Sequence, residues 1–306
     1  MTKPIPVALP FDPNPRQPRL PLPAGACDTH FHVFGPPNVF PYAASRRYEP
    51  PAGPIEYYWQ MQRITGLERG VVVQPGAHGL DHAAMLDAMS RSGGRLKGVV
   101  SMDSATTDAE LARFAAAGVV GARFALMSDR PGDRAAIEAA VPRLARLGWS
   151  LDLHIEAEHL VANEVFIRAL PVTTVIDHMG RPEPAHGLDQ PAFRLLLDLL
   201  RDQRFWTKIS ALDKLSTNRQ ANVPDGIPFK DTIAFARAVI AAAPDRVIWG
   251  TDWPHGNTFT PGQVPNDGTL LDLLAEIAPD QATRRRILVD NPARLYGFPS
   301  APLSTI

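Results

Sequence analysis

The feature that most constrains the fold is a regular alternation of short β-rich runs with amphipathic helical runs. The β-rich runs are largely apolar and often β-branched, as strands buried on both faces of a parallel sheet are. We expect strands at residues 26–33, 69–74, 97–102, 119–126, 150–156, 173–178, 205–210 and 246–251. Helical patterns follow them at 55–66, 80–92, 108–117, 134–147, 157–169, 190–203, 231–243 and 267–278. Eight strand–helix units in succession predict a (β/α)8 TIM barrel of the α/β class.

Both ends of the chain depart from this alternation. Residues 1–25 are rich in proline and show no periodicity, which predicts an N-terminal arm lying on the surface of a single barrel domain, residues 26–306. An extra C-terminal helix over 281–296 is expected to close the bottom or side of the barrel. The alternative fold, a doubly wound open sheet, predicts a glycine-rich phosphate loop after an early strand, and none is visible.

Composition excludes several classes of protein. The formal net charge of -1 gives no global field that would attract nucleic acid or an anionic membrane. No apolar run reaches the ~20 residues of a membrane span, and prolines interrupt the first 15 residues where a secretory signal would lie. The single cysteine, Cys27, excludes an internal disulfide and fits a reducing compartment. We expect a cytoplasmic protein without nucleic-acid or membrane partners, and the oligomeric state is left open.

Three polar clusters stand at the exits of predicted strands. They are Asp28-Thr29-His30-Phe31-His32, Asp177-His178-Met179-Gly180-Arg181-Pro182 and Gly250-Thr251-Asp252-Trp253-Pro254-His255. Because strand residues alternate faces, His30 and His32 point the same way. Two such imidazoles can bind a metal or polarise a carbonyl, and Asp252 is a candidate general base or metal ligand. Strand exits meet at one mouth of a barrel, so these clusters predict one shared site.

Cationic and polar side chains near the same strand ends are candidates for binding substrate. Arg123 lies within an otherwise small and apolar strand, where a guanidinium needs an anionic partner, either a bound substrate or a structural carboxylate. Arg130 follows in the next loop, and Arg181 follows His178, where it could brace loops instead. His154 lies on the fifth strand.

Two connections are unusually long for a compact domain. Residues 34–53 follow the first strand and contain Tyr48, and residues 211–230 follow the seventh strand and contain Lys214. Long loops of this kind are usually lids or binding loops. Both are expected on the strand-exit face, beside the predicted site.

Taken together, the three clusters resemble the lactonase branch of the amidohydrolase superfamily, and within it the hydrolases of 2-pyrone-4,6-dicarboxylate. The resemblance extends from about residue 24 to residue 298. Further segments that carry it are Val33-Phe34-Gly35-Pro36, Val39-Phe40-Pro41-Tyr42, Val71-Val72-Val73-Gln74 and Asp290-Asn291-Pro292-Ala293-Arg294-Leu295-Tyr296.

The resemblance implies a (β/α)8 barrel and a set of roles. Many superfamily members bind one or two divalent metals, and binuclear members commonly add a carboxylated lysine on strand 4, a position that Arg123 takes here. The pyrone-dicarboxylate branch works without metal. In that branch the residues matching His30, His32 and His178 surround the scissile carbonyl, and the match of Asp252 activates water.

The resemblance also assigns a substrate-binding set. Arg123, Arg130 and Tyr48 match the branch, whereas His154 replaces a tyrosine and Lys214 replaces an arginine. With Arg181 they make up the expected substrate-binding residues. The catalytic set is therefore intact while part of the pocket is altered.

We expect metal-independent hydrolysis of a small, anionic, carboxylated lactone, with no cofactor. The substrate named by the resemblance is 2-pyrone-4,6-dicarboxylate, opened to 4-oxalomesaconate in the catabolism of aromatic acids. One alternative is a mononuclear lactonase or decarboxylase of the same superfamily, in which one divalent metal such as zinc activates the water. The other is a non-catalytic protein that binds dicarboxylates.

Overall fold

The computed structural model describes residues 5–127, 133–224 and 226–299 of the 306-residue chain. Its centre is one sheet of eight parallel strands, each hydrogen-bonded to the next in sequence order. The strands are β1 (Cys27–Phe31), β2 (Arg69–Val73), β3 (Leu96–Val100), β4 (Val119–Leu126), β5 (Ser150–Ile155), β6 (Thr174–Ile176), β7 (Phe205–Ile209) and β8 (Val247–Trp249). Backbone bonds of 2.8 Å from Asp252 N to His30 O and from His32 N to Trp253 O join the two edges. The predicted (β/α)8 barrel is confirmed.

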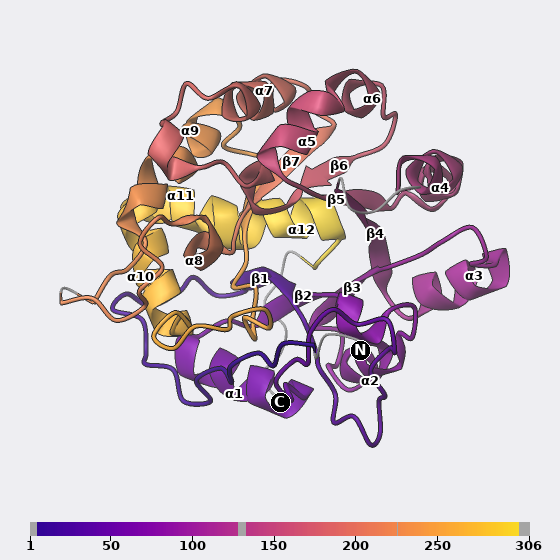
Figure 1. The fold of residues 1–306 in the computed structure, drawn as a ribbon, viewed down its shortest axis with the longest axis horizontal. Helices are drawn as coiled ribbons and strands as arrows, with labels where there is room; N and C mark the ends of the chain where they lie inside the picture. Colours follow the sequence, from indigo (N-terminus) through magenta and orange to yellow (C-terminus); the bar gives the residue numbers. More distant parts are fainter. Residues whose placement is uncertain (1–4, 128–132, 225, 300–306) are drawn as a thin grey trace.

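The helices lie around the strands, as Figure 1 shows. They are α1 (Ile55–Thr65), α2 (Ala83–Ser90), α3 (Asp108–Ala116), α4 (Asp133–Leu147), α5 (Ala157–Ala162), α6 (Glu164–Arg168), α7 (Pro191–Leu199), α8 (Leu212–Leu215), α9 (Ile233–Ala242), α10 (Asp267–Ile277), α11 (Gln281–Arg285) and α12 (Asn291–Tyr296). Short 3₁₀ turns are η1 (Gly76–His78), η2 (Asp177–Gly180), η3 (Pro184–His186) and η4 (Lys230–Thr232). In the described residues no helix is both long and apolar enough to cross a membrane.

Two predicted helices depart from regular α-helical geometry in the structure. The helix expected over 157–169 is broken at Asn163, whose ψ of 16° departs from helical geometry, into α5 and α6. The helix expected over 281–296 is continuous but widens into a π-helical segment, Arg286–Asp290, between α11 and α12. The single turn α8 was not predicted, because four residues are too few to show helical periodicity.

Local sequence signals explain where α3 begins and ends. Thr107 Oγ1 accepts the N–H of Glu110, and the Glu110 carboxylate accepts the N–H of Thr107, so the two residues form a capping box. Gly118 follows α3 with a φ of +95°, which a residue with a side chain adopts only at a cost. The chain thus turns sharply into β4.

The barrel interior is apolar at its lower end. A second hydrophobic cluster is separate from the one between the sheet and the helices. It joins alternate strand residues to the C-terminal segment, and its members include Val71, Val73, Val175, Ile248, Tyr296 and Phe298. Residues two apart on a strand share a face, so these valines point into the barrel together. The α12 region therefore plugs the bottom, and the polar residues are left for the mouth.

Residues 5–25 form an arm without helix or extended strand. Ala8 N donates to Glu49 O at 2.9 Å, and Leu9 N donates to Thr258 O at 2.8 Å. Farther along, Arg16 pairs with Asp272 of α10. The arm thus ties the loop after β1 to the loop after β8 on the outside of the barrel.

Candidate active site

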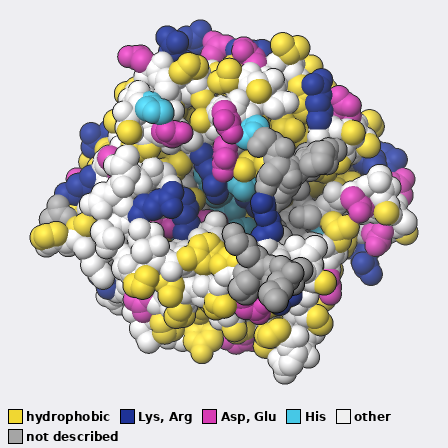
Figure 2. Space-filling model, in the orientation of Figure 1, with side chains coloured by type: hydrophobic (Ala, Val, Ile, Leu, Met, Phe, Trp, Pro, Cys, Tyr) yellow, Lys and Arg dark blue, Asp and Glu magenta, His cyan; other side chains and the backbone are white. Residues whose placement is uncertain are grey.

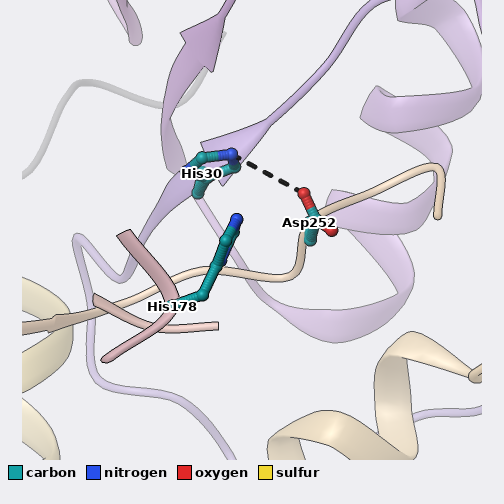
Figure 3. Close-up of side chains that lie close together, drawn as sticks. All are labelled: His30, His178 and Asp252. Atoms are coloured by element: carbon teal, nitrogen blue, oxygen red, sulfur yellow. Dashed lines mark ion pairs between the residues drawn. The ribbon is translucent and has the colours of Figure 1, made fainter. Parts of the chain in front are cut away.

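Four polar side chains from three strand exits meet at the mouth of the barrel. His30 lies in β1, His32 follows β1, His178 lies in η2 directly after β6, and Asp252 follows β8. Asp252 Oδ1 is 3.6 Å from His30 Nε2 and 3.3 Å from His32 Nε2. The ring centres of His30 and His178 are 4.8 Å apart. Figure 3 shows both rings beside the Asp252 carboxylate, so the expected site is assembled in space.

The chain places His178 and Asp252 by turning through an uncommon backbone conformation. Residues 178–181 all have positive φ, 53° at His178 and 50° at Arg181, and Asp252 has a φ of 63°. For a residue with a side chain this left-handed region costs about 1–2 kcal/mol. Ser210, directly after β7, helps to hold the first turn, because its Oγ lies 2.7 Å from His178 Nδ1. Such strain is common where a functional side chain must be aimed.

Hydrogen bonding restricts the protons on His32. Its Nδ1 lies 2.8 Å from the carbonyl oxygen of Val73, which can only accept, so Nδ1 carries a proton. In neutral His32 the unprotonated Nε2 would face Asp252 Oδ1, and two acceptors repel each other. A proton on this pair, or a bridging donor such as water, is therefore needed at the mouth.

Burial and neighbouring charges set the protonation of the other groups. Burial, reinforced by the Lys208 charge, lowers the pKa of His30 well below its usual value, and burial lowers the pKa of His178 to about 3. Burial alone would raise the pKa of Asp252, but the hydrogen bond with His32 and the nearby imidazoles hold it well below its usual value. At neutral pH an ionised carboxylate therefore faces neutral His30 and His178 rings.

The donor set at the mouth fits one metal ion by number and spacing. One ligand atom each from His30, His178 and Asp252 lies within 4.8 Å of the others, and three protein ligands are usual for catalytic zinc. His30 Nε2 is buried and has no hydrogen-bond partner among the described residues. The ammonium of Lys208, 3.2 Å from the other ring nitrogen of His30, opposes a further cation. This geometry keeps the single-metal alternative open.

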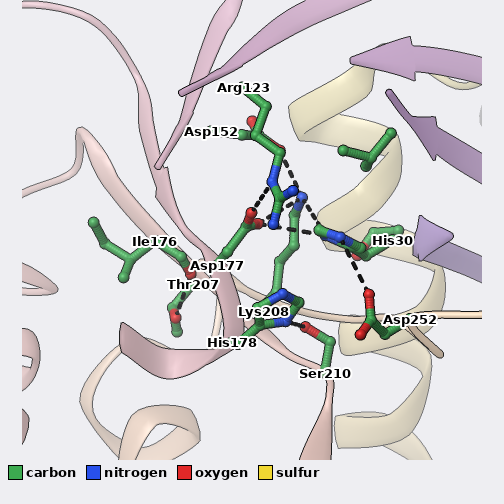
Figure 4. Close-up of polar contacts among 12 residues, drawn as sticks. His30, Arg123, Asp152, Ile176, Asp177, His178, Thr207, Lys208, Ser210 and Asp252 are labelled. Atoms are coloured by element: carbon green, nitrogen blue, oxygen red, sulfur yellow. Dashed lines mark hydrogen bonds and ion pairs between the residues drawn. The ribbon is translucent and has the colours of Figure 1, made fainter. Parts of the chain in front are cut away.

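Next to the histidines lies a buried group of four charges, of which the sequence had indicated only Arg123 as needing a partner; no role was predicted for Lys208, Asp152 or Asp177. Lys208 Nζ is 2.5 Å from Asp152 Oδ2 and 3.0 Å from Asp177 Oδ1, and Arg123 Nε is 2.7 Å from Asp177 Oδ2 (Figure 4). Lys208, Asp152 and Asp177 are fully buried. The sequence did hold a signal for this group, because a charged residue stands inside each of two strand runs, Leu151-Asp152-Leu153 and Thr207-Lys208-Ile209. A buried charge requires a partner of opposite charge, so the two could have been expected to pair.

The expected substrate-binding residues fall into two groups, of which the first lies beside the catalytic side chains. Burial raises the pKa of Tyr48, and the charge of Asp252 raises it further. His154 lies with its ring centre 5.9 Å from that of His178, and its buried Nε2 has no hydrogen-bond partner among the described residues. Arg123 is engaged by Asp177, so its anionic partner in the structure is a structural carboxylate.

The second group lies farther out on the rim. Lys214 Nζ is 3.2 Å from Asp213 Oδ2 and donates to Thr258 Oγ1, and Arg181 pairs with Glu156 at 3.3 Å. Lys214 and Arg181 line one cavity of about 490 Å³. Figure 2 shows a central hollow with histidine in its depth and cationic side chains around it. Arg130 lies outside the described residues.

Comparisons with known proteins agree with this architecture. Residues 27–298 match the amidohydrolase family model. The chain is 42% identical over 289 residues to 2-pyrone-4,6-dicarboxylate hydrolase of Comamonas testosteroni, and the alignment covers 92% of this chain and 93% of the relative. It is 40% identical to 4-sulfomuconolactone hydrolase of Hydrogenophaga intermedia, with 91% of each chain covered. It is 30% identical to D-galactarolactone isomerase of Agrobacterium fabrum, with 93% of each chain covered. The chain belongs to the amidohydrolase family.

Proposed function

We propose that this protein hydrolyses a small anionic lactone in the catabolism of aromatic acids, without a metal. The observation that carries the proposal is the contact of the ionised Asp252 carboxylate with His30 and His32 at the barrel mouth. A base, hydrogen-bond donors and nearby cations are what ester hydrolysis of an anionic substrate requires. Lactone hydrolases at 40% and 42% identity over nearly the whole chain support the same reaction class.

The geometry suggests how the reaction proceeds. Asp252 takes a proton from water, and the water oxygen attacks the lactone carbonyl. His30, His32 and His178 surround the position where negative charge develops on that carbonyl oxygen. The donors to it are the N–H groups of His30 and His178, each typically worth about 3 kcal/mol, while His32 contacts the Asp252 carboxylate through Nε2. Collapse of the tetrahedral intermediate breaks the bond to the ring oxygen, which receives the proton and yields a ring-opened acid.

The low pKa of Asp252 shapes this mechanism. The carboxylate is ionised throughout the neutral range, so the base is always in its active form. It is also a weak base, because a low pKa means a low affinity for the proton. Proton transfer from water must therefore coincide with stabilisation of the oxyanion, which makes the histidine donors as necessary as the carboxylate.

The substrate assignment rests on the cations and polar groups around the mouth. We propose 2-pyrone-4,6-dicarboxylate, opened to 4-oxalomesaconate, as the first substrate to test, with Arg123, Tyr48 and His154 beside the ring. Lys214 and Arg181 would face an outer acidic group. A lysine is a point charge, whereas arginine offers a planar fork, so Lys214 suits a tetrahedral sulfonate as well as a carboxylate. A lactone sulfonate is the second substrate to test.

The single-metal alternative has its own structural support. His30, His178 and Asp252 would hold the ion, and a bound zinc would supply a water of lowered pKa. In that case Asp252 would be a ligand, and His32 would be left to orient the substrate. We favour the metal-free assignment because the Lys208 ammonium lies 3.2 Å from the His30 ring.

The proposal is tested with a panel of lactones and purified protein. The panel contains 2-pyrone-4,6-dicarboxylate, 4-sulfomuconolactone and a neutral pyrone of the same shape, and NMR identifies each product. We expect ring-opened acids from the anionic lactones and a very poor rate with the neutral one. A rearranged lactone as sole product would indicate an isomerase, as in the Agrobacterium relative, and binding without turnover would indicate a binding protein.

A further inference from the structure

We propose that Lys208 is a positioning residue: it donates a hydrogen bond to His30 Nδ1 and thereby holds His30 as the tautomer with its proton on Nε2. That proton then faces the barrel mouth, where the proposed function places the developing oxyanion. The inference rests on the proposed function for the role of the proton, but the tautomer itself is a property of the protein without substrate. Figure 4 shows the His30 ring between the Lys208 ammonium and the Asp252 carboxylate.

The contacts of the Lys208 ammonium fix the direction of this hydrogen bond. Nζ lies 2.5 Å from Asp152 Oδ2, 3.0 Å from Asp177 Oδ1 and 3.2 Å from His30 Nδ1. An ammonium group has three donors and no acceptor. Asp152 Oδ2 and His30 Nδ1 lie in hydrogen-bond geometry with Nζ, whereas Asp177 Oδ1 is an ion-pair contact only. Because the ammonium can only donate, His30 Nδ1 must accept and cannot itself carry the proton of a neutral ring.

The competing arrangement would place the proton on Nδ1 and direct it to Asp177. Asp177 Oδ1 is 3.4 Å from His30 Nδ1, but this oxygen lacks a well-aligned hydrogen bond in the structure. A proton on Nδ1 would also face the Lys208 donors at 3.2 Å. Two donors at that distance repel, so the arrangement with the proton on Nε2 is favoured.

Lys208 can remain charged in this interior because its surroundings balance it. Asp152 and Asp177 contribute two negative charges, and Lys208 and Arg123 contribute two positive charges. Burial alone would lower the pKa of Lys208, but the two carboxylates raise it above its ordinary value. Leaving any one of these charges without its partner in the interior is strongly unfavourable.

The tautomer has a chemical consequence at the mouth. Nε2–H is a donor, which serves a carbonyl oxygen that gains negative charge. A nitrogen that carries this proton has no lone pair for a metal, so His30 in this state does not act as a ligand through Nε2. Lys208 thus favours hydrogen-bond catalysis over metal binding at the same three side chains.

The test compares wild type, Asp152→Asn and the double variant Asp152→Asn/Lys208→Met. The double variant removes one positive and one negative charge, which leaves Asp177 paired with Arg123. The single variant is the matched control, because its amide oxygen can still accept from Lys208. Imidazole ¹⁵N NMR of histidine-labelled protein reports the tautomer directly, and the His30 signals are assigned by their loss in His30→Gln.

We expect the wild type and the single variant to show a protonated Nε2 at His30. The double variant should shift protonation toward Nδ1, bind zinc at least about 10-fold more tightly by calorimetry with zinc alone, and lose about 10²-fold in kcat relative to the single variant with little change in KM. An unprotonated Nε2 in wild-type His30 would overturn the inference, whether or not the double variant folds. An unchanged wild-type pattern in the double variant would overturn the role of Lys208.

The spectra need no substrate, so this result is separable from the proposed function. A wild-type protein with the Nε2 proton that hydrolyses no lactone would refute the proposed function and leave the tautomer assignment standing. A protein that hydrolyses the lactone with the proton on Nδ1 would refute the inference alone.

Discussion

Replacing Asp252 with asparagine should separate its chemical role from its structural one. The residue has a φ of 63°, a conformation that asparagine tolerates about as well as aspartate, whereas alanine would add strain. The amide keeps the size of the carboxylate and can donate to His32 Nε2, 3.3 Å away, which needs a partner. We therefore expect Asp252→Asn to fold with the mouth intact.

The expected loss follows from the role of the base. An amide cannot take a proton from water, and a positioned general base is commonly worth ~10²–10⁴-fold. We predict that kcat falls by at least about 10²-fold, or about 2.7 kcal/mol in the activation free energy. KM should stay the same or fall, because removing a negative charge near the substrate weakens no attraction to an anionic lactone.

The assay is stopped-flow absorbance of the pyrone ring, with Glu156→Gln as control. Glu156 also lies near the mouth, where it pairs with Arg181 at 3.3 Å. Among the described residues it has no hydrogen bond or ion pair with the three histidines. The control should retain kcat. A near-normal kcat in Asp252→Asn would place the base elsewhere, and a comparable loss in Glu156→Gln would identify it.

Three further predictions concern stability, specificity and the arm. His178 has a pKa of about 3 in the folded protein and about 6.5 when unfolded, so the stability it contributes is complete above pH 6.5 and is lost as the pH falls toward 3. About 2 kcal/mol of the free energy of unfolding should be lost by pH 5. The melting temperature of His178→Gln should depend less on acid pH than that of the wild type. Lys214→Met should raise KM for a dianionic lactone about 10-fold or more without affecting a neutral one, and equal effects on both would contradict the assigned contact. Deleting residues 1–9 removes the backbone bonds to Glu49 and Thr258 and should raise KM with little change in kcat, whereas unchanged steady-state kinetics would show that the arm does not position these loops.

The fold and the convergence of the site were predictable because both depend on patterns of short range. Eight apolar runs with intervening helical periodicity define the barrel, and a polar motif at a strand exit must reach its mouth. His30, His178 and Asp252 could be brought together on that basis although they are far apart in sequence. The bottom plug was also predictable, as a helix with no strand after it.

The supporting layer of the site could not be predicted in the same way. Whether Lys208 meets Asp152 and Asp177 depends on register and stagger between strands β5, β6 and β7, which no single run encodes. The left-handed turn at residues 178–181 contains one glycine and therefore carries little sequence signal. The low pKa of Asp252 likewise follows from the imidazoles around it and cannot be seen in its own segment.

The central claim is that Asp252 and the histidines hydrolyse the lactone without a metal. Its most direct test is the turnover of 2-pyrone-4,6-dicarboxylate by protein treated with a chelator, with metal content measured on the same sample. We predict an unchanged kcat/KM at far less than one metal per chain, and no gain when zinc is added. Stoichiometric zinc whose removal abolishes turnover, and whose return restores it, would contradict the account.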